Sequence, residues 1–166
     1  MSRTDFPKQF LDILNTGRTL IQSTYDRFAL FIPAENIYVV TSDQYNDIVA
    51  EQLPLLPLGN ILCEPSRKNT APCIAYISYK LRQLNPDANL VCAPADHIIL
   101  QPEAFKEVCL RALDFTAHIK GLVTLGIKPT HPNTGYGYIQ FEQQSVSDSV
   151  YKVKTFTEKP DRELAK

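Results

Sequence analysis

The 166-residue sequence lacks an excess of charge of either sign. Lys and Arg together number 17 and Asp and Glu 18, which gives a formal net charge of -1. A protein that binds nucleic acid must neutralise phosphates with a basic surface, so this balance argues against nucleic acid as a partner. A small anionic ligand stays open, because it needs only a few well-placed cations.

Long hydrophobic runs are also missing. No apolar stretch approaches the roughly 20 residues that span a bilayer as a helix. The first residues do not show the basic region and apolar core of a signal peptide. We therefore expect no membrane partner and a cytoplasmic location.

Cysteine is scarce and unevenly spaced. The four residues Cys63, Cys73, Cys92 and Cys109 form no CxxC pair, and each lies in an apolar run. This pattern predicts reduced, buried thiols rather than a zinc site or a disulfide framework. Reduced thiols fit a reducing cytoplasm.

Glycine is rarer than proline, six residues against twelve, which indicates short, stiff connections. No G-x-G-x-x-G motif occurs, so a Rossmann dehydrogenase is disfavoured.

Apolar runs typical of buried strands alternate with segments of helical period. Strands are expected at residues 36–40, 60–65, 89–96 and 122–127, and helices at 19–31, 41–53, 70–85 and 105–119. Two further extended segments, 136–141 and 150–160, flank a polar turn. Short connections between alternating helices and strands predict a mostly parallel sheet with helices on both faces. We expect a three-layer α/β/α fold that occupies residues 1–166 as a single, partial domain.

Polar residues cluster after the expected strands, where open α/β sheets bind ligands. The first cluster lies between a strand and a helix and contains Glu64, Arg67, Lys68, Asn69 and Thr70. Free backbone N–H groups at a helix start, together with two cations, could hold an anion or a polar ring. The alternative is a capped, solvated turn.

Asp96 follows the apolar run "NLVCAPA". A carboxylate at the end of a central strand is a candidate Mg²⁺ ligand, because Mg²⁺ takes one or two carboxylates together with substrate phosphates. The alternative is an aspartate that caps a turn.

Two more clusters lie in the last third of the chain. Gly135 and Gly137 flank Tyr136, which indicates that the backbone closely approaches a neighbouring strand or a ligand hydroxyl. Glu158 and Lys159 stand at the end of an extended segment before a proline. Such a lysine either binds a phosphate or is an ordinary surface residue.

Five stretches in this order resemble one family. They are "MSRTDFPKQFL", "CEPSRKNTAPCIA", "APADHII", "TGYGYI" and "FTEKPD", and they run from Ser2 to Asp161. Together they resemble the sugar-1-phosphate nucleotidyltransferases, and more closely the mannose-1-phosphate guanylyltransferases. The resemblance implies a Rossmann-like, glycosyltransferase-A-like fold.

The resemblance also implies a reaction and its ligands. GMP would pass from GTP to mannose 1-phosphate, giving GDP-mannose and pyrophosphate, with Mg²⁺ as cofactor. The family motifs imply that Lys8 and Asp96 are catalytic, with Lys8 binding the phosphates and Asp96 binding the metal. The residues expected to bind the nucleotide are Glu64, Arg67, Asn69 and Thr70. Those expected to bind the sugar phosphate are Gly137, Glu158 and Lys159. Whether the protein forms a homo-oligomer stays open.

The sequence departs from the family pattern in two ways. Arg67-Lys68-Asn69-Thr70 stands where the family carries Arg-Asn-Thr, so one residue is inserted or Lys68 replaces the arginine. The family's "GGxGxRLxP" phosphate loop and a second metal-binding aspartate do not occur here, so we expect a domain truncated at both ends, with little or no turnover. The alternatives are a non-catalytic sugar-nucleotide-binding or regulatory protein, or an enzyme for another base or hexose.

Overall fold

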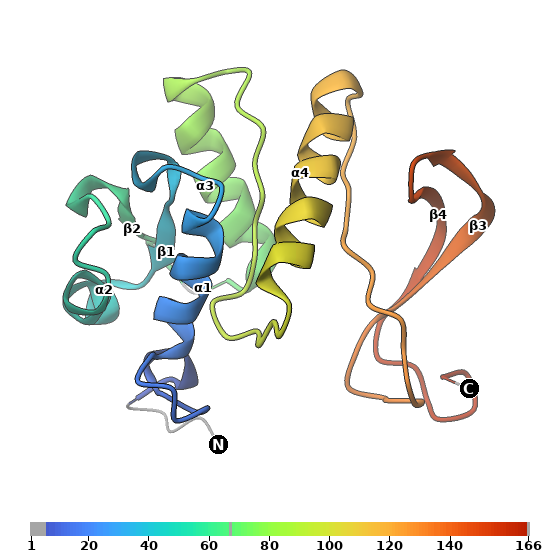
Figure 1. The fold of residues 1–166 in the computed structure, drawn as a ribbon, viewed down its shortest axis with the longest axis horizontal. Coiled ribbons are helices and arrows are strands. Elements are labelled where there is room, and N and C mark those ends of the chain that lie inside the picture. Colours follow the sequence, from blue (N-terminus) through green and yellow to red (C-terminus); the bar gives the residue numbers. More distant parts are fainter. Residues whose placement is uncertain (1–5, 67, 166) are drawn as a thin grey trace. The chain divides into compact units, whose positions relative to one another are not determined.

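The computed structural model describes residues 6–66 and 68–165 (Figure 1). The chain divides into two compact units, Met1–Val123 and Thr124–Lys166. None of the helices in the described part of the chain is long and apolar enough to cross a membrane.

The first unit contains α-helices, short 3-10 helices (labelled η) and two strands. In chain order they are η1 (Lys8–Phe10), α1 (Leu20–Ala29), η2 (Ala34–Asn36), β1 (Val39–Thr41), η3 (Asp43–Tyr45), α2 (Asn46–Gln52), η4 (Leu58–Asn60), β2 (Ile61–Cys63), α3 (Thr70–Leu84) and α4 (Pro102–His118).

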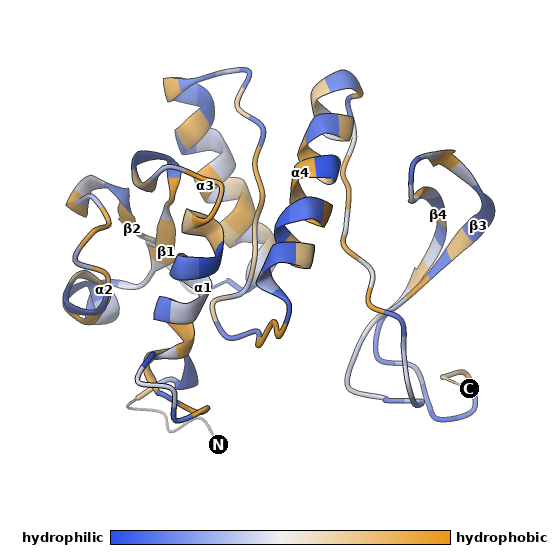
Figure 2. Cartoon of the chain, viewed as in Figure 1, coloured by the Kyte–Doolittle hydropathy of each residue, from blue (hydrophilic) through white to orange (hydrophobic). Residues whose placement is uncertain are grey.

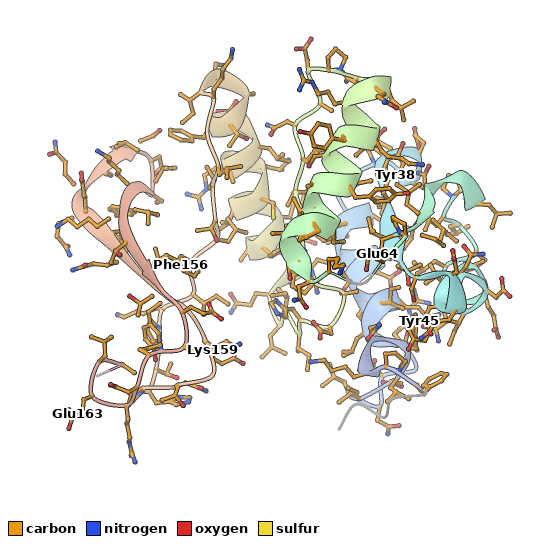
Figure 3. All side chains as sticks on the ribbon, turned by 180° about the vertical axis from the view of Figure 1, so that it is seen from behind. Tyr38, Tyr45, Glu64, Phe156, Lys159 and Glu163 are labelled. Carbon is orange, nitrogen blue, oxygen red and sulfur yellow. The ribbon has the colours of Figure 1, made fainter. Side chains whose placement is uncertain are left out.

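Strands β1 and β2 form a parallel pair in which Val39 lies opposite Ile61 and Thr41 opposite Cys63. A parallel pair needs a crossover connection, and the chain between the strands provides it with α2. Within the first unit, α1 faces the viewer in Figure 1, whereas α3 faces the viewer in Figure 3, which is the view from behind. Helices and a parallel pair of strands confirm the expected α/β fold.

The core of the first unit lies between η1, α1, α2 and β2. Its buried members are Phe10, Ile21, Tyr25, Val49, Leu53, Leu56 and Ile61. Figure 2 shows hydrophobic residues on β1, and hydrophobic and hydrophilic residues on different sides of α4. Burial of one such side chain stabilises a fold by about 1.5–3 kcal/mol, so this cluster fixes η1 against the two helices.

Local signals place the ends of the expected helices. Thr19 and Gln22 form a capping box at the start of α1, in which each side chain accepts a hydrogen bond from the other residue's backbone N–H. Helix α3 begins at Thr70 and ends at Leu84, immediately before Asn85-Pro86. Proline disfavours helical backbone in the residue that precedes it, so these sequence predictions are confirmed.

Two expected strands are absent from the described part of the chain. Residues 89–96 and 122–127 are not strands, and the sheets there contain only the pairs β1–β2 and β3–β4. A strand requires a hydrogen-bonded neighbour, which an apolar run alone does not supply. Leu122 and Ile127 are accordingly exposed rather than buried.

Helix α4 is joined to α1 through a buried cation. The Arg27 guanidinium carbon lies 5.1 Å from the centre of the Phe105 ring, and Nη2 donates a hydrogen bond to Thr24 Oγ1 at 3.2 Å. Burial lowers the pKa of Arg27. Such cation–π contacts gain strength when they are shielded from water.

All four cysteines are free thiols, as expected, but their burial varies. Cys109 is buried in α4, whereas Cys92 is exposed. The expectation that every thiol is buried is therefore wrong for Cys92. In the described part of the chain, residues 89–96 form no strand that would place Cys92 inside a sheet.

The second unit contains an antiparallel hairpin of β3 (Tyr138–Ser147) and β4 (Val150–Thr157). This confirms two extended segments joined by a turn, but β3 continues to Ser147, so most of the residues expected in the polar turn belong to the strand. Near the end of the chain, the Asp161 carboxylate accepts hydrogen bonds from the backbone N–H groups of Glu163 and Leu164 at 3.1 and 2.9 Å.

Two leucines near the end of α2 test the position of this core. Leu53 is 3% exposed and Leu55 is 76% exposed. We expect Leu53→Ala to lower the free energy of unfolding by about 2–5 kcal/mol, because it leaves a cavity. The matched variant Leu55→Ala should change it by less than about 0.5 kcal/mol. Urea unfolding followed by circular dichroism measures both, and equal effects would show that the core lies elsewhere.

Candidate active site

Lys8 lies on a short turn that a buried ring holds in place. Pro7, with φ of -62°, precedes η1, and the Phe10 N–H donates to the Pro7 carbonyl at 3.1 Å. Phe10 is 3% exposed, and its ring centre lies 5.5 Å from that of Tyr45. The turn therefore presents Lys8 to solvent while Phe10 anchors it in the core.

A carboxylate closes the loop between η1 and α1. Asp12 accepts hydrogen bonds from the N–H groups of Thr16 at 3.0 Å and Gly17 at 2.7 Å. These bonds, that of Thr16 foremost, lower the pKa of Asp12. Gly17 has a φ of 79°, which a residue with a side chain rarely adopts.

Lys8 and Asp96, which are far apart in the sequence, are in contact. Lys8 Nζ lies 2.8 Å from Asp96 Oδ2, and the two side chains are 47% and 27% exposed. Ala95, the neighbour of Asp96, packs against the core, and its carbonyl accepts a hydrogen bond from Thr24 Oγ1 at 3.5 Å. The scaffold thus brings together the two residues that are expected to be catalytic.

The loop expected to bind the nucleotide joins β2 to α3. Glu64 is half-buried beside α3 (Figure 3), and its N–H donates to the Thr41 carbonyl at 2.8 Å. Asn69 has a φ of 68° and precedes the exposed Thr70 at the start of α3. Arg67 lies outside the described residues.

The expected sugar-phosphate residues meet in the second unit. A Cβ atom added to Gly137 would lie 2.9 Å from a ring carbon of Phe156 and 3.0 Å from Glu158 Oε2. Lys159 Nζ lies 3.4 Å from Glu158 Oε1. The close approach predicted for Gly137 is therefore made by residues of β4 and its continuation, which Figure 3 labels at Phe156 and Lys159.

Lys159 also has an unusual backbone conformation. Its φ is 42°, and it precedes the buried Pro160. Non-glycine residues rarely adopt positive φ, and they persist there only where the surrounding structure holds them. This constraint fixes the direction in which the lysine leaves the chain.

Asp96 is the expected metal ligand. In the described part of the chain, no three His, Cys, Asp or Glu side chains are close enough together to hold a metal ion.

Comparison with known proteins identifies the family. The family model described as nucleotidyl transferase matches residues 2–166. The chain belongs to the nucleotidyl transferase family.

Two relatives of this nucleotidyl transferase chain carry the same description. A mannose-1-phosphate guanylyltransferase of Escherichia coli is 40% identical over 99% of the chain and 36% of the relative. The mannose-1-phosphate guanylyltransferase RfbM of Salmonella typhimurium is 38% identical over 99% of the chain and 34% of the relative. The chain thus spans about a third of the length of these curated relatives.

A solved structure from Thermus thermophilus shares the fold. It is described as a mannose-1-phosphate geranyltransferase, and it matches with a TM-score of 0.83 and 29% identity. The match covers 98% of this nucleotidyl transferase chain and 46% of the other.

Gln52 is absent from the residues that the sequence motifs point to. In the structure, Gln52 Nε2 donates to the Phe10 carbonyl at 3.2 Å, and Gln52 Oε1 accepts from Thr19 Oγ1 at 2.8 Å. No sequence pattern marks a glutamine that joins three segments, because its partners are distant in the sequence.

Substitution of Gly137 tests the geometry of the second unit. Gly137→Ala should displace the Phe156 ring and the Glu158 carboxylate, because no Cβ fits at 2.9 Å. NMR shifts of the Phe156 ring and the Glu158 side chain measure this displacement. Gly126→Ala is the matched control, since nothing lies within 4 Å of its added Cβ. Unchanged Phe156 and Glu158 signals in Gly137→Ala would contradict the described packing.

Proposed function

We propose that this chain provides part of the active site of a mannose-1-phosphate guanylyltransferase, which uses GTP and mannose 1-phosphate to make GDP-mannose and pyrophosphate. One observation carries the proposal: Lys8 Nζ lies 2.8 Å from Asp96 Oδ2. The guanylyltransferases that match 99% of the chain support the choice of substrates.

The reaction needs positioning more than proton transfer. The second pKa of a sugar phosphate is about 6, so mannose 1-phosphate is mostly a dianion at neutral pH. One of its oxygens forms a bond to the α-phosphorus of GTP, and the bond from that phosphorus to the β-phosphate oxygen breaks. Pyrophosphate leaves with the electron pair. The protein must therefore hold the phosphates in line and neutralise their charge.

Lys8 and Asp96 suit opposite parts of this task. In the structure each neutralises the other, so ligands of both signs are needed to replace the pair. The Lys8 ammonium would pair with a phosphate oxygen of GTP, and the Asp96 carboxylate would bind a cation. When a cation and a triphosphate bind together, the Lys8–Asp96 ion pair is replaced by two others, Lys8 with phosphate and Asp96 with the cation.

Mg²⁺ fits the donor set around Asp96. The carboxylate is partly exposed, and among residues 6–66 and 68–165 no cluster of three potential ligands surrounds it. Mg²⁺ binds in this way, through one or two carboxylates together with phosphates and water. When bound, it would neutralise charge on the phosphates of GTP.

The remaining residues receive roles that their positions allow. Glu64 and Asn69 lie on the β2–α3 loop and Thr70 begins α3, and all three would contact the nucleotide. In the second unit, Glu158 would accept hydrogen bonds from sugar hydroxyls, and Lys159 would pair with the phosphate of mannose 1-phosphate. Gly137 leaves room for Glu158 to lie close to the backbone. None of the relatives' descriptions favours a non-catalytic regulator.

Binding of GTP in the presence of Mg²⁺ tests this assignment. We expect Lys8→Ala to raise the Kd about tenfold or more, because a charge-assisted contact to phosphate is lost. The matched variant Lys120→Ala removes an exposed lysine that has no expected role, and its Kd should change less than about twofold. Isothermal titration calorimetry measures both.

Two further titrations test the metal-binding role of Asp96 and the preference for guanine as the nucleobase. Asp96→Asn should remove the dependence of GTP affinity on Mg²⁺, because the amide is a poor substitute for the carboxylate ligand. Equal Kd values for Lys8→Ala and the wild type would contradict the phosphate role, and equal affinity for UTP and GTP would contradict the guanine assignment.

A further inference from the structure

Gln52 connects three segments of the first unit through hydrogen bonds. It is the last residue of α2 and is half-buried. Its side-chain Nε2 donates to the Phe10 carbonyl of η1 at 3.2 Å, and its Oε1 accepts from Thr19 Oγ1 at 2.8 Å. Its backbone carbonyl accepts from Gln22 Nε2 at 3.0 Å. One residue thus ties η1 and the start of α1 to the end of α2.

The chemistry of the partners requires an amide. The Phe10 carbonyl can only accept a hydrogen bond, so the group that faces it must be a donor. On the other side, the Thr19 hydroxyl donates to Oε1. A glutamate would keep the acceptor for Thr19 but place a carboxylate oxygen against the Phe10 carbonyl. A methionine would fill a similar volume and make neither bond.

The bond to Phe10 bears directly on Lys8. The three residues of η1 form a single turn, in which the N–H groups of Phe10 and Leu11 donate to the carbonyls of Pro7 and Lys8, both at 3.1 Å. A change in the direction of the Phe10 carbonyl rotates this turn and with it the Cα–Cβ bond of Lys8. Because a productive site tolerates displacements of only about 0.5 Å, the turn needs an external hydrogen bond as well as the buried Phe10 ring.

We propose that Gln52 is a positioning residue that sets the place of Lys8 by holding the Phe10 carbonyl. Its role in GTP binding rests on the function proposed above, whereas the anchoring of η1 does not.

Amide hydrogen exchange tests the anchoring without any ligand. In Gln52→Met and Gln52→Glu, exchange at Phe10 and Leu11 should be about fivefold to tenfold faster than in the wild type, as expected when one net hydrogen bond is lost. Amides in the middle of α3 serve as the internal reference. Gln83→Glu, an exposed glutamine of α3, makes the same charge change and should leave exchange in η1 unaltered. Unchanged exchange at Phe10 and Leu11 in both Gln52 variants would overturn the proposal.

A double-mutant cycle tests whether Gln52 acts through Lys8. We expect Gln52→Met to raise the Kd for GTP with Mg²⁺ about tenfold when Lys8 is present, and to have no further effect in a Lys8→Ala background. Loss of general stability would lower affinity equally in both backgrounds, and that result would overturn the positioning role. Thr19→Ser, which keeps the hydroxyl that Gln52 accepts from, should retain the wild-type Kd.

The two proposals fail in different ways. If the wild-type chain binds no GTP, the proposed function and the role of Gln52 in it are wrong, and the exchange rates alone decide whether Gln52 anchors η1. If GTP binds and Lys8→Ala weakens it while Gln52→Met does not, the function stands and the positioning role is wrong.

Discussion

The contact between Lys8 and Asp96 is the interaction on which the account of the site depends. Both side chains are partly exposed, and an exposed ion pair contributes only about 0–1 kcal/mol to stability. The pair therefore does not hold the fold together. Instead, the fold holds the pair, through the buried Phe10 ring on one side and the packing of Ala95 on the other. A weak pair in a fixed position fits the proposed site, in which ligands would replace it.

The polar scaffold around this pair is as specific as the hydrophobic core. Phe10, Val49 and Leu53 provide burial, but burial alone tolerates small rotations of a short turn. The capping box of Thr19 and Gln22 and the hydrogen bonds of Gln52 restrict these rotations, because a hydrogen bond weakens when its donor and acceptor turn away from each other. In the second unit, Gly137 also makes the packing specific. It has no side chain, so Phe156 and Glu158 can lie close to its backbone.

Features encoded locally could be predicted from the sequence, and features that depend on distant partners could not. Thr19 marks the start of α1 and Asn85-Pro86 marks the end of α3, because capping and proline chemistry act over a few residues. Residues 89–96 and 122–127 have the composition of strands, but pairing depends on a neighbour that no local pattern reports. The resemblance to a family assigned both Lys8 and Asp96 to catalysis, but no sequence pattern predicted that they are in contact. No sequence pattern predicted the hydrogen bonds of Gln52, because its partners Phe10 and Thr19 lie far away in the sequence.

A crystal structure of the chain with GTP and Mn²⁺ would test the central claim most directly, because anomalous scattering locates the metal. The account predicts a Mn²⁺ peak at the Asp96 carboxylate, a phosphate oxygen of GTP against Lys8 Nζ, and the separation of Lys8 from Asp96. A nucleotide bound elsewhere, with the contact between Lys8 and Asp96 intact, would contradict it.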